Sequence, residues 1–179
     1  MNQELVIWVD EQDRELGKVE RNKVHDPTNL LLHRETMELL FKDPGHIQFL
    51  MQKRSATKKQ YPNLWTFTAT CHVNPGDIGE SDPEGYLTAG GREAGEEVGV
   101  KVVNQQLVTK KIIETDINRA MAGLIVGEYV GEPMVDPEEV SEVRVFTRET
   151  IGEIRDQLTP AAMICLVLLG ILHDEEKKS

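Results

Sequence analysis

Apolar positions along the chain fall in short runs that are separated by turn-forming residues. Two turns are marked clearly, Asp10-Glu11-Gln12-Asp13-Arg14 and Asp43-Pro44-Gly45. Runs of this length between turn signals are typical of β-strands. The pattern therefore predicts six strands, over residues 4–9, 16–20, 37–42, 47–53, 102–114 and 118–129, the last with a buried stretch at 121–126.

Two helices are predicted near the C-terminus. Thr150 and Glu153 have the spacing of a capping box, so we expect residues 147–150 to cap a helix that runs through Ile154. Thr159-Pro160 predicts the start of a final helix over residues 159–173, whose apolar run is buried against the body or a partner chain. The tail from residue 174 to residue 179 is expected to fray.

A further predicted helix carries a dense group of acidic residues. Glu93, Glu96 and Glu97 stand at positions i, i+3 and i+4, so their carboxylates share one helix face. Arg92 can hydrogen-bond a carboxylate, and Gly99 suits the end of a helix. Such a cluster is either a solvated acidic face or a binding site for Mg²⁺ or Mn²⁺, which prefer oxygen ligands.

Composition limits the classes of function. The chain has 179 residues, 39% hydrophobic and 28% charged, which fits one globular domain over residues 1–179. Its formal net charge of −11 argues against nucleic acid as a partner, because nucleic-acid binders usually carry a basic patch. A metal-dependent site can still accept phosphates, because the ion carries the attraction.

The two cysteines and the termini indicate a cytoplasmic protein. Cys71 and Cys165 are too few for a disulfide framework or a zinc site, and we expect both to be reduced. The N-terminus lacks the features of a signal peptide. The longest apolar run, residues 161–169, is too short to span a bilayer, so we expect no membrane partner.

Residues 92–100 resemble the second half of the Nudix box, Arg-Glu-U-x-Glu-Glu-x-Gly-U, where U is a bulky aliphatic residue. All five named residues of that half are present, and Ala94 is small for U. A match at fixed spacing is more specific than an acidic cluster. The resemblance therefore favours the metal site over the solvated face.

The first half of the box is irregular and allows two alignments. Glu84 stands at the right distance before the box arginine, but the glycine then expected falls on Ile78. Alternatively, Cys71-His72-Val73-Asn74-Pro75-Gly76-Asp77 resembles the Gly-His-Val-x-x-Gly-Glu that often opens the box, with Asp77 in place of glutamate. We favour the second alignment, which makes residues 78–86 an inserted surface loop and leaves the role of Glu84 open.

The N-terminal half resembles the Nudix branch that includes isopentenyl diphosphate isomerase. The likeness covers the hairpin region, residues 4–34, and residues 52–65, which read Gln-x-Arg-Ser-x-x-Lys-x-x-x-Pro-x-x-Trp. Within this segment Arg54 and Lys58 suit the clamping of a diphosphate. Trp65 is expected in the core or a pocket wall, and residues 136–146 resemble a later strand of the same branch.

The resemblance implies the Nudix α/β/α sandwich, with a mixed sheet, a core over residues 35–165 and the box as a loop-helix-loop. It also implies hydrolysis of a diphosphate linked to another group, X, with Mg²⁺ or Mn²⁺ as cofactor. Glu93, Glu96 and Glu97 would be the metal ligands, with Glu96 and Glu97 also catalytic, and Arg92 would orient Glu93. Glu138, Glu139 and Glu142 are candidates for the general base, and we choose Glu139.

Two other functions remain open. Isomerisation of isopentenyl diphosphate needs a cysteine where this chain has Thr70, and Cys71, one residue later on a strand, points to the opposite face. The glutamate expected on a later strand, near residues 118–121, is also missing. A degenerate module that binds a nucleotide without turnover is the third function.

Several assignments stay open at this level. His72 is a metal ligand, as the isomerase resemblance suggests, or a pocket or core histidine. The expected partner is a small-molecule diphosphate whose X group is a nucleoside, a sugar, a prenyl group or a coenzyme. The apolar last helix packs on its own sheet or forms a homodimer.

Overall fold

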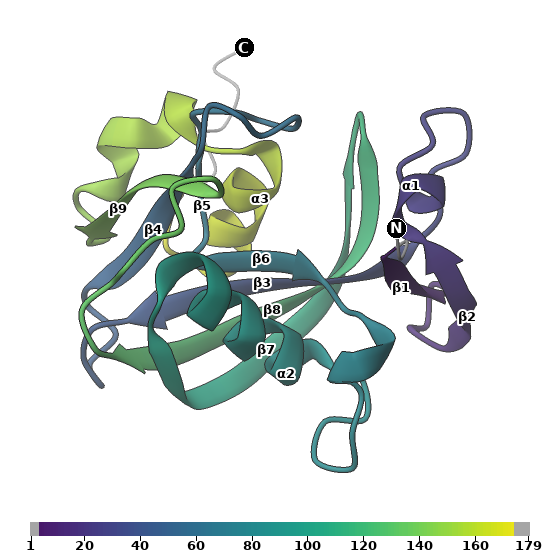
Figure 1. The fold of residues 1–179 in the computed structure, drawn as a ribbon. Coiled ribbons are helices and arrows are strands. Elements are labelled where there is room, and N and C mark those ends of the chain that lie inside the picture. Colours follow the sequence, from purple (N-terminus) through teal and green to yellow (C-terminus); the bar gives the residue numbers. More distant parts are fainter. Residues whose placement is uncertain (1–3, 174–179) are drawn as a thin grey trace.

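The computed structural model describes residues 4–173 and is built on one mixed β-sheet (Figure 1). β3 is its central strand: it pairs in parallel with β8 and antiparallel with β1, β4 and β6. β2 extends the sheet beyond β1, β7 pairs with β8, and β4 also pairs with β5 and β9. The strands are β1 (Leu5–Val9), β2 (Glu15–Glu20), β3 (His33–Phe41), β4 (Phe49–Arg54), β5 (Trp65–Thr66), β6 (Ala69–His72), β7 (Lys101–Thr115), β8 (Asn118–Val130) and β9 (Val140–Phe146).

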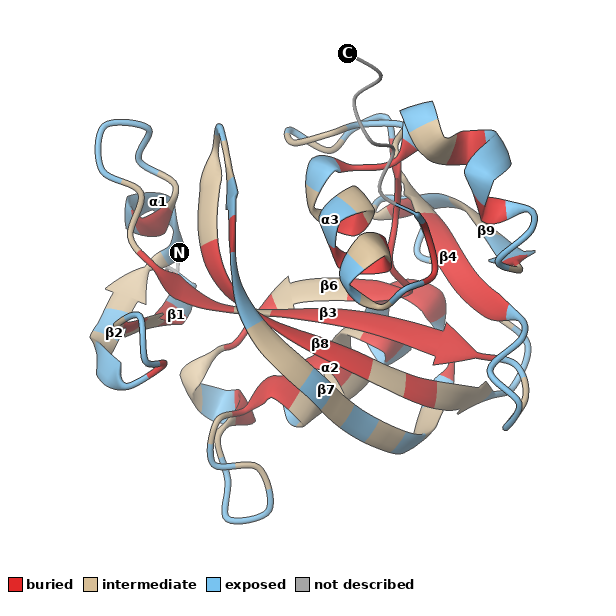
Figure 2. Cartoon of the chain, turned by 180° about the vertical axis from the view of Figure 1, so that it is seen from behind, coloured by how far each residue is buried: buried red, intermediate tan, exposed pale blue. Residues whose placement is uncertain are grey.

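Helices cover both faces of this sheet. They are α1 (Arg21–Val24), α2 (Tyr86–Glu93) and α3 (Pro160–Leu168), with 3₁₀ segments at Pro75–Asp77 and Ile151–Gln157 and a π-helical turn at Ala94–Val98. β3 is buried along nearly its whole length (Figure 2) because alternate residues face opposite layers. Met37, Leu39 and Phe41 join the core cluster that contains residues of α3, whereas Thr36 and Glu38 lie against α2. The predicted α/β/α sandwich is confirmed.

Most of the predicted strands are present. The two early turns join β1 to β2 and β3 to β4, with Leu40 opposite Leu50 and Phe41 opposite Phe49. β7 and β8 form a long hairpin whose tip lies beside α1 (Figure 1), and the ring of His25, which follows α1, contacts the carbonyl of Ile117 near that tip. Trp65 is buried in the core, 1% exposed, with its ring edge-on to Phe146.

The helix predictions need three corrections. The box helix begins earlier than expected, because Tyr86 is the first residue of α2 and is fully buried, so the surface loop ends before it. Thr150 does not form the predicted capping box: its hydroxyl accepts from the backbone of Thr147, and the segment that follows is 3₁₀ rather than α. The last helix stops at Leu168 rather than at residue 173, because Gly170 adopts a left-handed conformation with φ of 64°.

The C-terminal apolar residues pack onto the chain's own sheet. Cys165, Leu166, Ile171 and Leu172 belong to the same buried cluster as Met37 of β3. The predicted fraying of residues 174–179 lies outside the described residues. Between residues 4 and 173, no helix has the length and apolar character needed to cross a lipid bilayer.

Candidate functional site

The box segment is a helix whose second half is wound more loosely than its first. α2 runs to Glu93, a π-helical turn follows over Ala94–Val98, and Gly99 ends it with φ of 71°. A Cβ on Gly99 would lie 2.6 Å from the carbonyl oxygen of Met134, so glycine is required for both backbone angle and space. The predicted helix end at Gly99 is confirmed.

Arg92 ties this helix to the loop before it. Its Nε donates to Asp77 Oδ1 at 3.0 Å and its Nη2 to Asp77 Oδ2 at 3.2 Å. Its Nη1 donates to Glu93 Oε2 at 2.9 Å and to Glu96 Oε2 at 3.2 Å. A forked pair with buried Asp77 fixes the guanidinium, which in turn orients two box carboxylates.

The three box glutamates lie on the wall of one cavity of about 470 Å³, in different environments. Burial and the nearby charge of Glu97 raise the pKa of Glu93 to about 7. Glu97 is buried, and its Oε2 accepts from Gln52 Nε2 at 2.7 Å, whereas Glu96 is exposed. These carboxylates do not form one of the compact groups of possible metal ligands found among the described residues.

Basic residues also line this cavity. The ammonium of Lys58 bonds Glu139 Oε2 and lies 3.9 Å from Glu97 Oε1. Arg54 Nε donates to the carbonyl of Gln60 at 3.0 Å, and burial lowers the pKa of its guanidinium. The hydrogen bond from Lys58 lowers the pKa of Glu139. The fold thus brings Arg54, Lys58 and Glu139 to the cavity that the box glutamates line.

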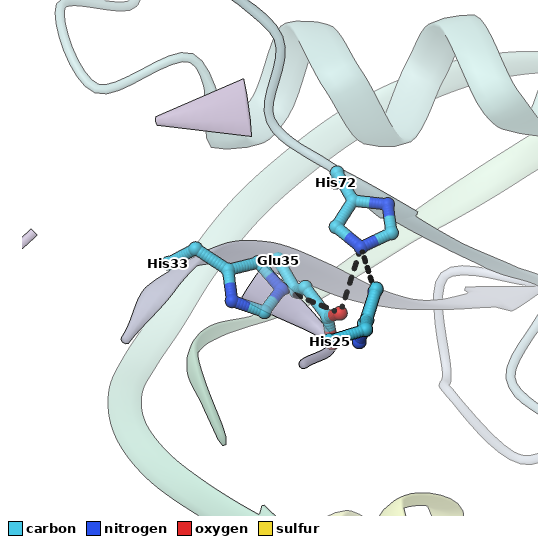
Figure 3. Close-up of side chains that lie close together, drawn as sticks. All are labelled: His25, His33, Glu35 and His72. Atoms are coloured by element: carbon cyan, nitrogen blue, oxygen red, sulfur yellow. Dashed lines mark hydrogen bonds and ion pairs between the residues drawn. The ribbon is translucent and has the colours of Figure 1, made fainter. Parts of the chain in front are cut away.

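A second group of possible metal ligands lies beside this cavity: His25, His33, Glu35 and His72 (Figure 3). One ligand atom from each lies within 4.8 Å of the other three. Glu35 Oε1 is 3.1 Å from His33 Nε2 and 3.3 Å from His72 Nε2, and the Nε2 atoms of His25 and His72 are 2.9 Å apart. Glu35 and His72 line the cavity directly.

Backbone carbonyls decide which nitrogens of this cluster face inward. His33 Nδ1 is 2.9 Å from the carbonyl of Leu31, and His25 Nδ1 is 3.3 Å from that of Ile117. Because a carbonyl only accepts, each Nδ1 carries a proton and donates to its carbonyl, and the Nε2 of each ring faces into the cluster. Carbonyls of this kind commonly orient metal-binding histidines.

The pKa shifts in this cluster favour the protonation states that can bind a cation. Burial lowers the pKa of His72 to about 3 and also lowers that of His25, so both rings are neutral at pH 7. Burial alone would raise the pKa of Glu35, but the hydrogen bond from His33 and the interaction with His72 bring it down to about 2. Asn118 Nδ2 donates to both Glu35 oxygens at 2.9 Å. Three imidazoles and one carboxylate form a donor set that suits Zn²⁺ or another transition-metal ion.

The sequence predicted only part of this cluster. His72 was one candidate ligand, whereas His25, His33 and Glu35 were not assigned. The signal for His25 and His33 was their place in the isomerase-like region, residues 4–34, and Glu35 lies just outside it. The chain assembles them from the end of α1, from β3 and from β6.

Thr70 and Cys71 line the cavity, whereas Glu84 does not. Cys71 Sγ donates to the carbonyl of Ala89 in α2, and burial keeps its pKa well above the usual value. Thr70, next to it on β6, also lines the cavity. Glu84 precedes α2 and pairs with Lys110 at 2.6 Å, at the helix end opposite to Glu93.

Comparisons with known proteins identify the family. No protein-family model matches the chain. It is 30% identical over 146 residues to an uncharacterized Nudix hydrolase of Pseudomonas aeruginosa, an alignment that covers 82% of this chain and 80% of that protein. It is also 27% identical over 172 residues to isopentenyl-diphosphate delta-isomerase 2 of Homo sapiens, covering 87% of this chain and 74% of the isomerase.

Solved structures share the fold. The DR0079 protein of Deinococcus radiodurans superposes with a TM-score of 0.67 and 20% identity, covering 90% of this chain and 97% of that one. A MutT protein of Methanosarcina mazei has a TM-score of 0.61 and 20% identity, covering 78% and 92% of the two chains. Together with the P. aeruginosa relative, the box residues and the sandwich show that this chain belongs to the Nudix hydrolase family.

Proposed function

We propose that this protein hydrolyses the diphosphate linkage of a nucleoside diphosphate-X compound with the help of Mg²⁺ or Mn²⁺. The observation that carries the proposal is one cavity lined by the box carboxylates together with Arg54 and Lys58. The basic side chains can bind diphosphate oxygens directly, whereas the carboxylates need a metal ion to do so. The raised pKa of Glu93 beside Glu97 fits a bound cation, because such an ion would relieve their repulsion.

Each residue has a separate role in this proposal. Glu93, Glu96 and Glu97 would hold the ion, which when bound lowers the pKa of water and offsets charge on phosphoryl oxygens. Arg92 orients Glu93 and Glu96. Arg54 and Lys58 bind the diphosphate oxygens, where the guanidinium fork and the ammonium are both suitable donors.

Lys58 links substrate binding to the general base. In the structure its ammonium is held by Glu139. A diphosphate competes for the same ammonium, and once Lys58 turns to it, the pKa of Glu139 rises toward its ordinary value. Glu139 is then a better acceptor for the proton of the attacking water.

The cluster of His25, His33, Glu35 and His72 would hold a second, transition-metal ion at the side of the cavity. This cluster and the box carboxylates offer different ligand atoms, which favours two different ions. Imidazole nitrogens suit Zn²⁺, and carboxylate oxygens suit Mg²⁺.

Isomerisation of a prenyl diphosphate is the second candidate, favoured by the isomerases among the relatives. Against it stands Cys71, whose half-buried thiol donates to the carbonyl of Ala89. Double-bond migration in isopentenyl diphosphate, followed by NMR, tests this candidate directly.

The main test is product release from a panel of nucleoside triphosphates, nucleoside diphosphate sugars, dinucleotides and prenyl diphosphates with Mg²⁺ or Mn²⁺. Metal-dependent cleavage is expected for at least one class, and Glu97→Gln should reduce kcat by about a hundredfold or more. Glu80→Gln, an exposed loop carboxylate, is the matched control and should retain activity. Full activity of Glu97→Gln, or no cleavage in the panel, would contradict the proposal.

A further inference from the structure

The cavity of the box glutamates opens into a second, larger chamber of about 930 Å³. This chamber lies between α1, the loop that contains Thr57 and Lys59, and the segment that contains Glu138. Arg54, Lys58 and Glu139 line both chambers, so the proposed diphosphate site forms the neck between them. A group attached to a diphosphate held at the neck therefore extends into the second chamber.

Polar and charged residues line this chamber. Of the described residues that line it, none has an aliphatic side chain, and the one ring is the imidazole of His25. That ring is packed edge-on to His33 and His72, with centroids 5.3 Å and 5.1 Å away. A prenyl chain would contact only the methylene stems of these residues and would displace water from their charged ends. A nucleobase would find no open aromatic face on which to stack.

The charges of the lining are balanced. Four glutamates face four basic residues there, Arg21, Arg54, Lys58 and Lys59. Two of the basic residues are already paired within the chamber, Arg21 with Glu4 at 2.8 Å and Lys58 with Glu139. An anionic group would meet carboxylates as often as cations, so the chamber offers no net attraction for further phosphates.

Neutral hydroxyl groups fit this lining best. Each hydroxyl donates one hydrogen bond and accepts others, and the wall presents carboxylate acceptors beside ammonium and amide donors, including Asn22 and Gln60. The methylene stems of lysine, arginine and glutamate give the faces of a sugar ring an apolar surface.

We propose that the second chamber binds a neutral sugar, so that the X group of the substrate is an uncharged, hydroxyl-rich sugar linked to the diphosphate. This inference rests on the proposed function for the placement of the diphosphate. The inference goes beyond the proposed function because it selects one class of X group and names the side chains that select this class.

The test compares three ligands that share the diphosphate: a nucleoside diphosphate hexose, the matching nucleoside diphosphate hexuronic acid and a prenyl diphosphate. Affinity by titration calorimetry with Mg²⁺ and kcat/KM are measured for each. We expect the hexose compound to be preferred over the uronic acid by about tenfold, in both affinity and kcat/KM, because the balanced chamber offers the added carboxylate no net attraction to offset the loss of its hydration. A preference for the prenyl compound or for the uronic acid would overturn the inference.

A charge reversal provides the matched variants. Glu138→Lys adds net positive charge to the chamber and should reduce the preference for the hexose about fivefold by improving affinity for the uronic acid. Glu80→Lys makes the same change in a loop that does not line the chamber and should leave the preference unchanged. Equal effects of the two variants would overturn the inference. Because affinity is measured separately from turnover, sugar preference without cleavage would contradict only the proposed hydrolysis, and cleavage without sugar preference only this inference.

Discussion

Glu38 is a buried carboxylate on the side of β3 that faces α2. Its Oε1 accepts from Gln105 Nε2 at 2.7 Å, whereas its Oε2 has no hydrogen-bond partner among the described residues. Burial raises its pKa to about 7 from an ordinary value of 4.5. A Cβ on Gly90 would lie 2.9 Å from Oε2, so the helix leaves no space for the carboxylate to move. Near pH 7 the folded protein therefore contains an ionised carboxylate, one oxygen of which has no hydrogen-bond partner among the described residues.

The pH dependence of stability follows from this shift. At pH values between 4.5, the ordinary pKa of Glu38, and about 7, its pKa in the folded protein, the folded state binds more protons than the unfolded state. The contribution of Glu38 to stability is therefore complete below about pH 4.5 and is lost as the pH rises through about 7. Glu38→Gln should therefore have little effect at pH 4 but stabilise the protein above pH 7, by about 3 kcal/mol at most. Calorimetric melting at pH 4 and pH 8 measures this, with exposed Glu80→Gln as control. An equal shift of Tm at both pH values would contradict it.

At the scale of single elements, the hydrogen bonds between Arg92 and Asp77 join the box helix to the loop before it. Asp77 was aligned with the missing box glutamate, and the structure gives it a different contact: it holds Arg92 rather than facing the cavity. The opposite end of the same loop is held by Asp82, whose carboxylate accepts from the backbone of Gly85 and Thr88 at the start of α2.

Substitutions of these two aspartates should have different effects. Asp77→Asn removes the charge that fixes Arg92, so Glu93 and Glu96 lose their orientation and kcat should fall about tenfold or more. Asp82→Asn weakens only the helix cap, which should lower stability by about 1 kcal/mol and leave kcat unchanged. Steady-state kinetics and thermal melting of both variants separate the two roles. A loss of kcat in Asp82→Asn alone would show that the arginine contact has no part in the site.

Local signals predicted the elements better than they predicted the site. The turn residues between β1 and β2 and between β3 and β4, and Gly99 at the end of the box helix, act over a few residues, so the sequence specifies them directly. Thr150 failed as a capping residue because its hydroxyl is used by Thr147, a local competitor that the spacing rule ignores. The bond between Lys58 and Glu139 joins residues 81 positions apart and depends on how β4 and β9 pair.

At the scale of the whole molecule, the chain brings two kinds of candidate metal ligand to one cleft. His25, His33 and His72 come from three elements, and Glu35 reaches them only because β3 pairs with β6, which places Glu35 opposite His72. This register explains why single-sequence reasoning missed Glu35: nothing in its own neighbourhood distinguishes it from a solvated carboxylate. The box glutamates, in contrast, are neighbours along one helix and were predicted from spacing.

The histidine cluster predicts a metal-dependent stability. Zn²⁺ at micromolar concentration should raise Tm at pH 7 by several degrees, because an ion that binds the folded state stabilises it. His25→Ala, a half-buried ligand, should lower zinc content and abolish the shift, whereas exposed His173→Ala should not. Elemental analysis and melting measure both effects. Equal zinc content in wild type and His25→Ala would contradict the assignment.

The most direct test of the account is hydrolysis of the preferred diphosphate substrate in ¹⁸O-enriched water with Mg²⁺, with the products analysed by mass spectrometry. Attack of water on one phosphorus of the linkage predicts two phosphate-containing products, one with a single ¹⁸O atom and one without label, at a rate that falls about a hundredfold in Glu97→Gln. A labelled hydroxyl on a free X group, or an equal rate in Glu97→Gln, would contradict the assignment of this cleft as the site of metal-assisted diphosphate hydrolysis.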